Sequence, residues 1–230
     1  MKEKRLGEWH AYWLAEQLMW FKALGLDMDK IQVREHKKSE LSHYSSATFD
    51  IDYDYPFGLK EVAGNANRGQ YDLTQHIKES KEKLEYFDEE SKQKVIPGVI
   101  EPTFGMERAF LAVLTNAYKD DKKRGNILLN LPPKLAPIKV GVFPLVNKLN
   151  KEAKKVYDLL KTEFTCQFDT SGSIGRRYAR ADEIGIPYCI TIDFESKKAK
   201  DVTIRDRNTT KQVRVKIEKL AETLRKLLLK

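Results

Sequence analysis

The stretch V-I-E-P-T-F-G-M-E-R-A-F-L-A-V-L, residues Val99–Leu114, contains a short apolar strand, a Pro-Thr-Phe-Gly corner and the start of an apolar helix. Two charged residues interrupt it, Glu101 at the end of the predicted strand and Arg108 in the first turns of the predicted helix. A charge in a low-dielectric site is costly unless it is paired or meets a ligand. From these residues alone, a structural Glu101–Arg108 ion pair is favoured over a ligand site.

Residues 1–132, which include this stretch, predict an α+β domain. Residues 9–24 are apolar on nearly all sides and predict a buried helix that ends near Gly25. Further along, strands are predicted over 31–36, 47–53 and 58–66, followed by a helix from Asp72. Several antiparallel strands and one strand-to-helix corner favour a substrate cleft lined by the sheet.

A domain boundary is predicted near residue 132, because N-L-P-P-K-L-A-P (130–137) has three prolines in eight residues. Beyond it, strands are expected over 137–146, 165–169 and 186–193, helices over 150–164, 173–185 and 217–229, and a hairpin over 201–208 and 210–216. Asn150 is the expected N-cap of the first of these helices, and Gly185 the end of the second. Residues 133–230 therefore predict a three-layer α/β domain with a mixed sheet.

The net charge is unevenly distributed. Residues 137–230 contain 21 Lys and Arg against 12 Asp and Glu, a net charge of +9, whereas residues 1–136 contain 21 against 22. This asymmetry favours a polyanionic partner, nucleic acid before membrane, with a solvated lysine-rich surface as the alternative. No apolar run has the length of a membrane span, and the start M-K-E-K-R-L-G lacks the apolar stretch of a secretory signal.

The two cysteines, Cys166 and Cys189, each lie inside a predicted strand. This placement favours reduced, buried thiols in a cytoplasmic protein, although a bridge between the two remains open. No membrane partner is expected, because no basic amphipathic membrane helix stands out in the sequence.

Three blocks of the first domain carry a family resemblance. R-E-H-K-K-S-E-L-S-H-Y (34–44), K-E-V-A-G-N-A-N-R-G-Q-Y-D-L (60–73) and V-I-E-P-T-F-G-M-E-R (99–108) resemble successive blocks of the catalytic domain of glycyl-tRNA synthetase, in its archaeal and eukaryotic form. Residues 133–230 look like the anticodon-binding domain shared by the glycyl, histidyl, threonyl and prolyl enzymes. The resemblance implies part of a class II synthetase antiparallel-sheet catalytic domain, followed by an anticodon-binding domain.

The resemblance also implies roles for individual residues. Arg108 would lie over the adenine of ATP and meet its phosphates, which suits a planar and permanently charged guanidinium. Glu101 would bind the ammonium group of glycine, so the ligand interpretation of both residues becomes the favoured one. Thr103 stands where the family has serine, and its added methyl group intrudes into the glycine pocket. Glu61 would lie near the ATP phosphates and their Mg²⁺, with an exposed strand glutamate as the equal alternative.

Two further features of these blocks are weaker. Asn67 replaces an aspartate that usually precedes Arg68 in the family, so a weaker amide contact is expected there in place of an ion pair. The spacing of His36, Glu40 and His43 is a poor match to a zinc site, because no third His or Cys ligand lies nearby.

The second domain offers candidate contacts to tRNA. RNA loops are recognised through unstacked bases, aromatic stacking and hydrogen-bonding edges. The expected tRNA-binding residues are Arg176, Arg177, Arg180, Arg205 and Arg207. Phe143 and Tyr178 are stacking candidates, although core positions are favoured for both.

The sequence therefore predicts a portion of a glycine–tRNA ligase that uses glycine, ATP, Mg²⁺ and tRNA(Gly). The first and second class II motifs have no counterpart before Met1. We therefore expect impaired activation of glycine by this chain alone, retained tRNA binding, and restoration by a partner chain that carries those motifs. The alternative is a non-catalytic, synthetase-like accessory protein that binds nucleic acid, so whether this chain alone is an enzyme stays open.

Overall fold

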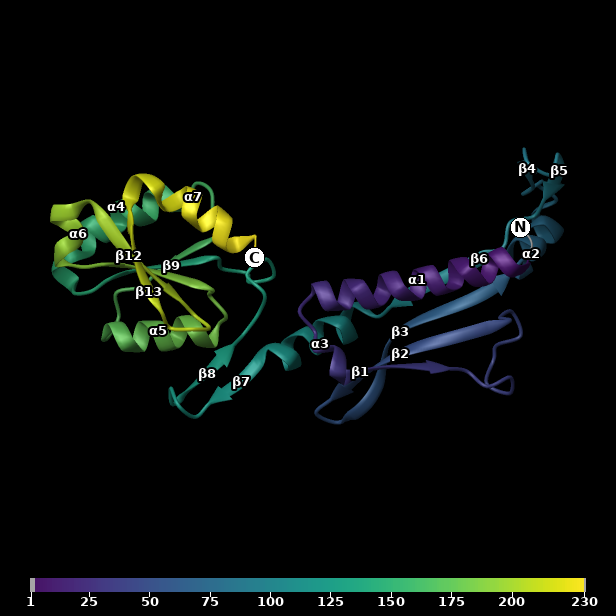
Figure 1. The fold of residues 1–230 in the computed structure, drawn as a ribbon, viewed down its shortest axis with the longest axis horizontal. Helices are drawn as coiled ribbons and strands as arrows, with labels where there is room; N and C mark the ends of the chain where they lie inside the picture. Colours follow the sequence, from purple (N-terminus) through teal and green to yellow (C-terminus); the bar gives the residue numbers. More distant parts are fainter. Residues whose placement is uncertain (1–2, 230) are drawn as a thin grey trace. The chain divides into compact units, whose positions relative to one another are not determined.

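The computed structural model describes residues 3–229 and divides into two units, Met1–Asn116 and Ala117–Lys230 (Figure 1). The first contains an antiparallel sheet and the second a mixed sheet with helices on both faces, which confirms the predicted fold class. The units divide before residue 132, because the hairpin at 118–129 belongs to the second unit.

The first unit is built on a four-stranded sheet in the order β1-β2-β3-β6, with antiparallel neighbours throughout. Its elements are α1 (Glu3–Ala23), the 3-10 turn η1 (Met28–Lys30), β1 (Ile31–Glu35), β2 (Ala47–Tyr55), β3 (Gly58–Gly69), α2 (Tyr71–Ser80), β4 (Tyr86–Asp88), β5 (Gln93–Val95), β6 (Val99–Phe104) and α3 (Met106–Ala117). Strands β4 and β5 form a separate small hairpin.

One face of this sheet is apolar and carries the core of the unit. Ile51, Tyr53 and Ala63 pack there against Phe21 of α1 and Ala112 of α3. The prediction of a helix buried all round is wrong for α1. Its inner side is buried, but its outer side, which includes three tryptophans, is exposed, because no further layer covers it among the described residues of this unit, which ends at Asn116.

The second unit is built on a five-stranded mixed sheet in the order β10-β9-β11-β12-β13, in which the first three strands are parallel and the last two antiparallel. Its elements are β7 (Tyr118–Asp121), β8 (Asn126–Leu129), β9 (Val140–Pro144), the 3-10 turn η2 (Asn147–Leu149), α4 (Asn150–Leu160), β10 (Cys166–Phe168), α5 (Ile174–Glu183), β11 (Tyr188–Ile192), α6 (Phe194–Ala199), β12 (Asp201–Asp206), β13 (Gln212–Lys216) and α7 (Ile217–Leu228).

Three layers result from the alternation of side chains along these strands. Val142 and Ile190 face α4 and α7, where Leu160 and Leu220 complete the larger core. Phe143, one residue away from Val142, faces the opposite side and packs with residues of α5. The core position favoured for Phe143 is confirmed, and Tyr178 packs beside it, so neither is a free stacking surface.

The ends of the helices follow the sequence with one exception. Gly185 lies at φ +82 after α5, a conformation that glycine adopts at little cost, and Ile186 N donates to the Ala181 carbonyl to close the helix. The prediction of Asn150 as an N-cap is wrong. The turn η2 leads directly into α4, so the cap position falls on Leu149 and has no side-chain cap bond.

Candidate functional site

Polar side chains gather on the sheet face opposite the core of the first unit. The register pairs Asp52 with Glu61, Gly64 with Thr103, and Ala66 with Glu101. Residues directly opposite each other in an antiparallel pair point to the same face. We call this the carboxylate face; its acidic members are Asp50, Asp52, Glu61 and Glu101.

Glu101 is held from one side by an arginine. Arg68 Nη1 donates to Glu101 Oε2 at 2.7 Å, and its Nε and Nη2 donate to the two carboxylate oxygens of Asp72 at 2.6 and 2.8 Å. The guanidinium also lies 4.0 Å over the ring of Tyr44. The hydrogen bonds to Asp72 and Glu101 raise the pKa of Arg68, and Arg68 lowers the pKa of Asp72. Because Arg68 neutralises only one of these two carboxylates, the group keeps a net negative charge, and Glu101 is its half-exposed member.

The Glu101–Arg108 ion pair favoured from the residues alone is absent from the described chain. Arg108 instead donates from Nη1 to the Glu61 carbonyl at 2.8 Å, and lies 3.6 Å from Glu61 Oε2. The Arg108 side chain is 57% exposed, and the Glu61 side chain is 50% exposed. Arg108 is therefore placed beside Glu61 by one firm bond to the backbone and keeps most of its donors available to a ligand.

The missing side chain of Gly64 leaves a narrow space on this face. A Cβ there would lie 3.5 Å from Thr103 Oγ1 and 3.9 Å from both Asp50 Oδ1 and Glu61 Oε1. The Thr103 hydroxyl is exposed and donates to the Gly64 carbonyl at 3.4 Å. The carboxylate face thus brings Asp50, Glu61 and Thr103 around Gly64, where a Cβ would be in van der Waals contact with all three side chains.

A second acidic pair on this face was not predicted. Asp50 and Asp52 are buried, Arg34 of β1 contacts both carboxylates, and His36 Nε2 lies 2.7 Å from Asp50 Oδ2. The alternation D-I-D-Y-D over 50–54 could have indicated it, since charges at every second position share one face. His36 belongs to this cluster, and His43 instead lies 3.2 Å from the Tyr71 hydroxyl.

The carboxylate face suits a Mg²⁺ ion that is bound mainly through phosphate oxygens. Among the side chains that the structure describes, no group of three or more His, Cys, Asp or Glu residues is placed to hold a metal ion. Mg²⁺ in nucleotide sites commonly uses one or two carboxylates plus phosphates. The exposed carboxylate of Glu61, beside Arg108, meets that requirement.

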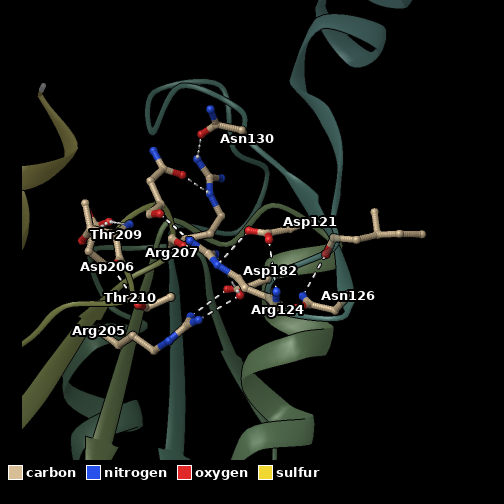
Figure 2. A network of polar contacts seen from close by, with 12 residues as sticks. Asp121, Arg124, Asn126, Asn130, Asp182, Arg205, Asp206, Arg207, Thr209 and Thr210 are labelled. Carbon is tan, nitrogen blue, oxygen red and sulfur yellow. Dashed lines mark hydrogen bonds and ion pairs between the residues drawn. The ribbon is translucent and has the colours of Figure 1, made fainter.

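In the second unit, two of the predicted tRNA-binding arginines are structural (Figure 2). Arg205 is buried and donates to both carboxylate oxygens of Asp182 at 2.7 and 2.9 Å, with its guanidinium 4.6 Å over the Tyr178 ring. Arg207 is 1% exposed and donates to the carbonyls of Gly185 and Leu131.

The same network fixes the hairpin β7–β8. Arg124 lies 3.0 Å from Asp121 and 3.6 Å from Asp182, and it donates to the carbonyls of Arg207 and Asn208 (Figure 2). Arg124 of the hairpin and Arg205 of strand β12 therefore both contact the buried carboxylate of Asp182.

The three arginines of α5 differ in their exposure. Arg177 is buried and donates to the carbonyls of Pro144 and Gly172. Arg180 is partly exposed and paired with Asp169 at 2.5 Å, and Arg176 is exposed. Burial argues against RNA contacts by Arg177, Arg205 and Arg207, and leaves Arg176 and Arg180 as the accessible candidates.

One exposed aromatic residue of the second unit was not predicted. Phe194 is 58% exposed at the start of α6. The preceding Asp193 accepts from Ser196 N at 2.9 Å, and Arg214 pairs with Asp193, Glu195 and Asp201. Arg214 thus braces both ends of the short helix that presents the Phe194 ring.

The comparisons with known proteins agree with this division into units. Residues 139–227 match the family model described as the anticodon binding domain, and they form most of the three-layer second unit. The class of the second unit is therefore that of an anticodon-binding domain.

Nearly the whole chain is similar to glycine–tRNA ligases. It is 48% identical over 94% of its length to the enzyme of Caldanaerobacter subterraneus subsp. tengcongensis, of which it covers 48%. It is 49% identical over 93% of its length to the enzyme of Lachnoclostridium phytofermentans, of which it covers 47%. The chain thus spans about half the length of the curated relatives it matches. These relatives are bacterial, so the resemblance to glycine enzymes gains support but its archaeal and eukaryotic form does not.

Proposed function

We propose that this chain is the part of a glycine–tRNA ligase that contributes the glycine- and ATP-binding carboxylate face and the anticodon-binding domain. The observation that carries the proposal is the 48% identity over 94% of the chain, which extends across both units. Among residues 3–229 no helix is both long and apolar enough to span a membrane. A cytoplasmic role in translation fits the proposal.

The carboxylate face would bind glycine and ATP. Glu101 accepts hydrogen bonds from the glycine ammonium group, and Thr103 with Gly64 limits the space for a side chain. Arg108 stacks on the adenine and contacts phosphate oxygens, and Glu61 contributes a carboxylate to Mg²⁺, which neutralises phosphate charge when bound.

The reaction needs no protein nucleophile. The glycine carboxylate attacks the α-phosphate of ATP and displaces pyrophosphate, and a terminal hydroxyl of tRNA then attacks the carbonyl carbon and displaces AMP. The residues of this chain act by positioning the reactants and by balancing charge.

The second unit would bind the anticodon region of tRNA(Gly). Arg176 and Arg180 offer phosphate contacts, and the Phe194 ring offers a stacking surface for an unstacked base. These two kinds of contact depend differently on salt, because phosphate contacts release counterions and stacking does not.

The experiment is filter retention of tRNA(Gly) by the full chain at several salt concentrations. Arg176→Gln should weaken binding and reduce the salt slope by about 0.7–0.9. Phe194→Ala should weaken binding roughly tenfold at an unchanged slope. The control variant Lys83→Ala/Lys94→Ala removes two exposed charges from the first unit and should change neither quantity.

Anticodon dependence provides the decisive comparison. The wild-type chain should bind a tRNA(Gly) transcript with a substituted anticodon more weakly than the native transcript. The Phe194→Ala variant should bind the two transcripts equally. Equal binding of both transcripts by the wild-type chain would refute anticodon recognition by the second unit.

A further inference from the structure

The outer side of α1 carries a row of large apolar side chains. We call it the aromatic stripe; its members are Trp9, Tyr12, Trp13, Met19 and Trp20. Its four aromatic residues are 39–47% exposed, and Met19 is 63% exposed. The ring centroids of Trp9 and Tyr12 lie 5.5 Å apart, and those of Tyr12 and Trp13 lie 5.4 Å apart, so these three rings form a continuous surface. The exposed Glu16 separates them from Met19 and Trp20, one turn further along the helix.

Polar contacts on the inner side of α1 fix the rotation of the helix. His10 Nε2 lies 3.0 Å from the Asn65 carbonyl, and Gln17 Nε2 donates to the carbonyls of Gly64 and Thr103 at 3.0 and 3.1 Å. Gln17 Oε1 also accepts from Asn65 Nδ2 at 3.0 Å. If the stripe turned inward, these hydrogen bonds would break and the polar groups of the sheet would be buried without partners. The hydrogen bonds of His10 and Gln17 therefore keep the aromatic side of α1 facing outward.

The stripe extends to an edge of the sheet. Trp20 packs against Phe104, with ring centroids 4.6 Å apart, and Phe104 is itself exposed at the end of β6. Strand β6 is a terminal strand of the four-stranded sheet and carries Glu101 and Thr103. A protein that covers the stripe would therefore reach the strand that bears the candidate glycine-binding residues.

The composition of the stripe is that of a protein interface. Trp, Tyr and Met are enriched at the centres of interfaces, and a cluster of them on a water-exposed surface is unfavourable. The glycine–tRNA ligases that match this chain are about twice as long as the matched region, so about half of each relative has no counterpart here.

We propose that the aromatic stripe is the docking surface for the polypeptide that corresponds to this remaining half of a glycine–tRNA ligase. The inference rests on the proposed function for the identity of the partner. The apolar partner surface would pack on the stripe and extend to Phe104 at the end of β6.

Intrinsic fluorescence provides a direct test, because the three tryptophans of the chain all lie in the stripe. The unmatched half of the Caldanaerobacter relative is added to the full chain, and the two are also co-expressed with a tag on one of them. We expect a one-to-one complex in sedimentation, a blue shift of tryptophan emission and reduced quenching by acrylamide.

Two variants separate the stripe from exposed aromatic residues in general. Trp9→Ser/Trp13→Ser retains Trp20 as a reporter and should weaken the complex by roughly tenfold or more. Tyr86→Ser/Phe87→Ser alters equally exposed aromatics on the hairpin β4–β5 of the same unit and should leave the affinity unchanged. Circular dichroism confirms that each variant is folded.

The proposal is overturned if the wild-type chain forms no complex in either format, or if both variants bind as tightly as wild type. It is also overturned if the chain alone forms a dimer that Trp9→Ser/Trp13→Ser abolishes, since the stripe would then bind a second copy. Filter retention of tRNA(Gly) is measured in parallel. If the wild-type chain did not bind tRNA(Gly), this result would count against the proposed function, and formation of the complex would be judged separately.

Discussion

Arg207 is held inside the second unit by four hydrogen bonds. Its guanidinium donates to the carbonyls of Gly185 and Leu131 and to the side-chain oxygens of Asn130 and Asn208. Burial lowers the pKa of this guanidinium, because desolvation disfavours its charged form. An arginine that appears suited to RNA in the sequence therefore joins β12 to the loop that follows β8.

Arg207→Ala should destabilise the second unit. It leaves two buried carbonyls without their donors, and each such group costs about 1–3 kcal/mol. Urea unfolding followed by far-UV circular dichroism is the suitable measurement, because the three tryptophans report only on the first unit. Arg176→Ala removes the same side chain from an exposed site and should unfold like wild type; a similar loss of stability in both variants would contradict this account.

At the scale of the element, the short helix α6 depends on its cap. Asp193 and Ser196 form a capping box, and Arg214 pairs with Asp193 and Asp201. The hydrogen bond from Arg214, together with those from Ser196, lowers the pKa of Asp193 from its usual 3.8 to about 2. The carboxylate is thus bound in its charged form in the folded state.

This pKa shift predicts a pH dependence. Because the folded pKa lies below the unfolded one, the contribution to stability is complete above pH 4 and is lost as the pH falls towards 2. Asp193→Asn should lower the free energy of unfolding at pH 7 and make it less dependent on pH between 4 and 2. The control Asp120→Asn, on the hairpin β7–β8, should keep the wild-type pH profile; an unchanged profile for Asp193→Asn would rule out this role.

The elements that the sequence predicted are those with clear periodicity or a clear end signal. The strand at 186–193 and the helix ended by Gly185 are examples, and both are confirmed. Helix α6 has six residues and no apolar period, so its cap and Arg214 determine it rather than its pattern. The hairpin β7–β8 depends on Arg124, whose two carbonyl acceptors lie more than eighty residues away in the sequence.

The candidate site was predictable only in part, for a related reason. The residues of β6 and β3 were found because their blocks resemble a family, whereas the pairing of Arg68 with Glu101 and of Arg34 with Asp50 depends on strand register. Asn67 illustrates the limit. It accepts from Gly69 N at 3.1 Å, and the ion pair that it cannot form is supplied by Asp72.

At the scale of the whole molecule, the two units divide the proposed chemistry. The residues proposed for glycine and ATP lie in the first unit, and the positive charge and the anticodon-binding domain lie in the second. Binding of tRNA and activation of glycine should therefore be separable by experiment.

Glycine-dependent ATP–pyrophosphate exchange tests this separation. The chain spans about half the length of its relatives. From the class II resemblance we expect further contacts to the transferring phosphate to lie in the half that this chain does not match. Losing one such preorganised contact costs about 10²–10³ in rate. We expect the exchange rate of the chain alone to be at least about 10²–10³ times lower than that of the full-length Caldanaerobacter enzyme. Retained binding of tRNA(Gly) would show that the chain is folded.

Adding the remaining half of that enzyme should restore exchange to the wild-type chain but not to the Glu101→Gln variant, because its carboxamide cannot balance the charge of the glycine ammonium group. Exchange by the chain alone at the rate of the full-length enzyme would show that the residues described here suffice for activation.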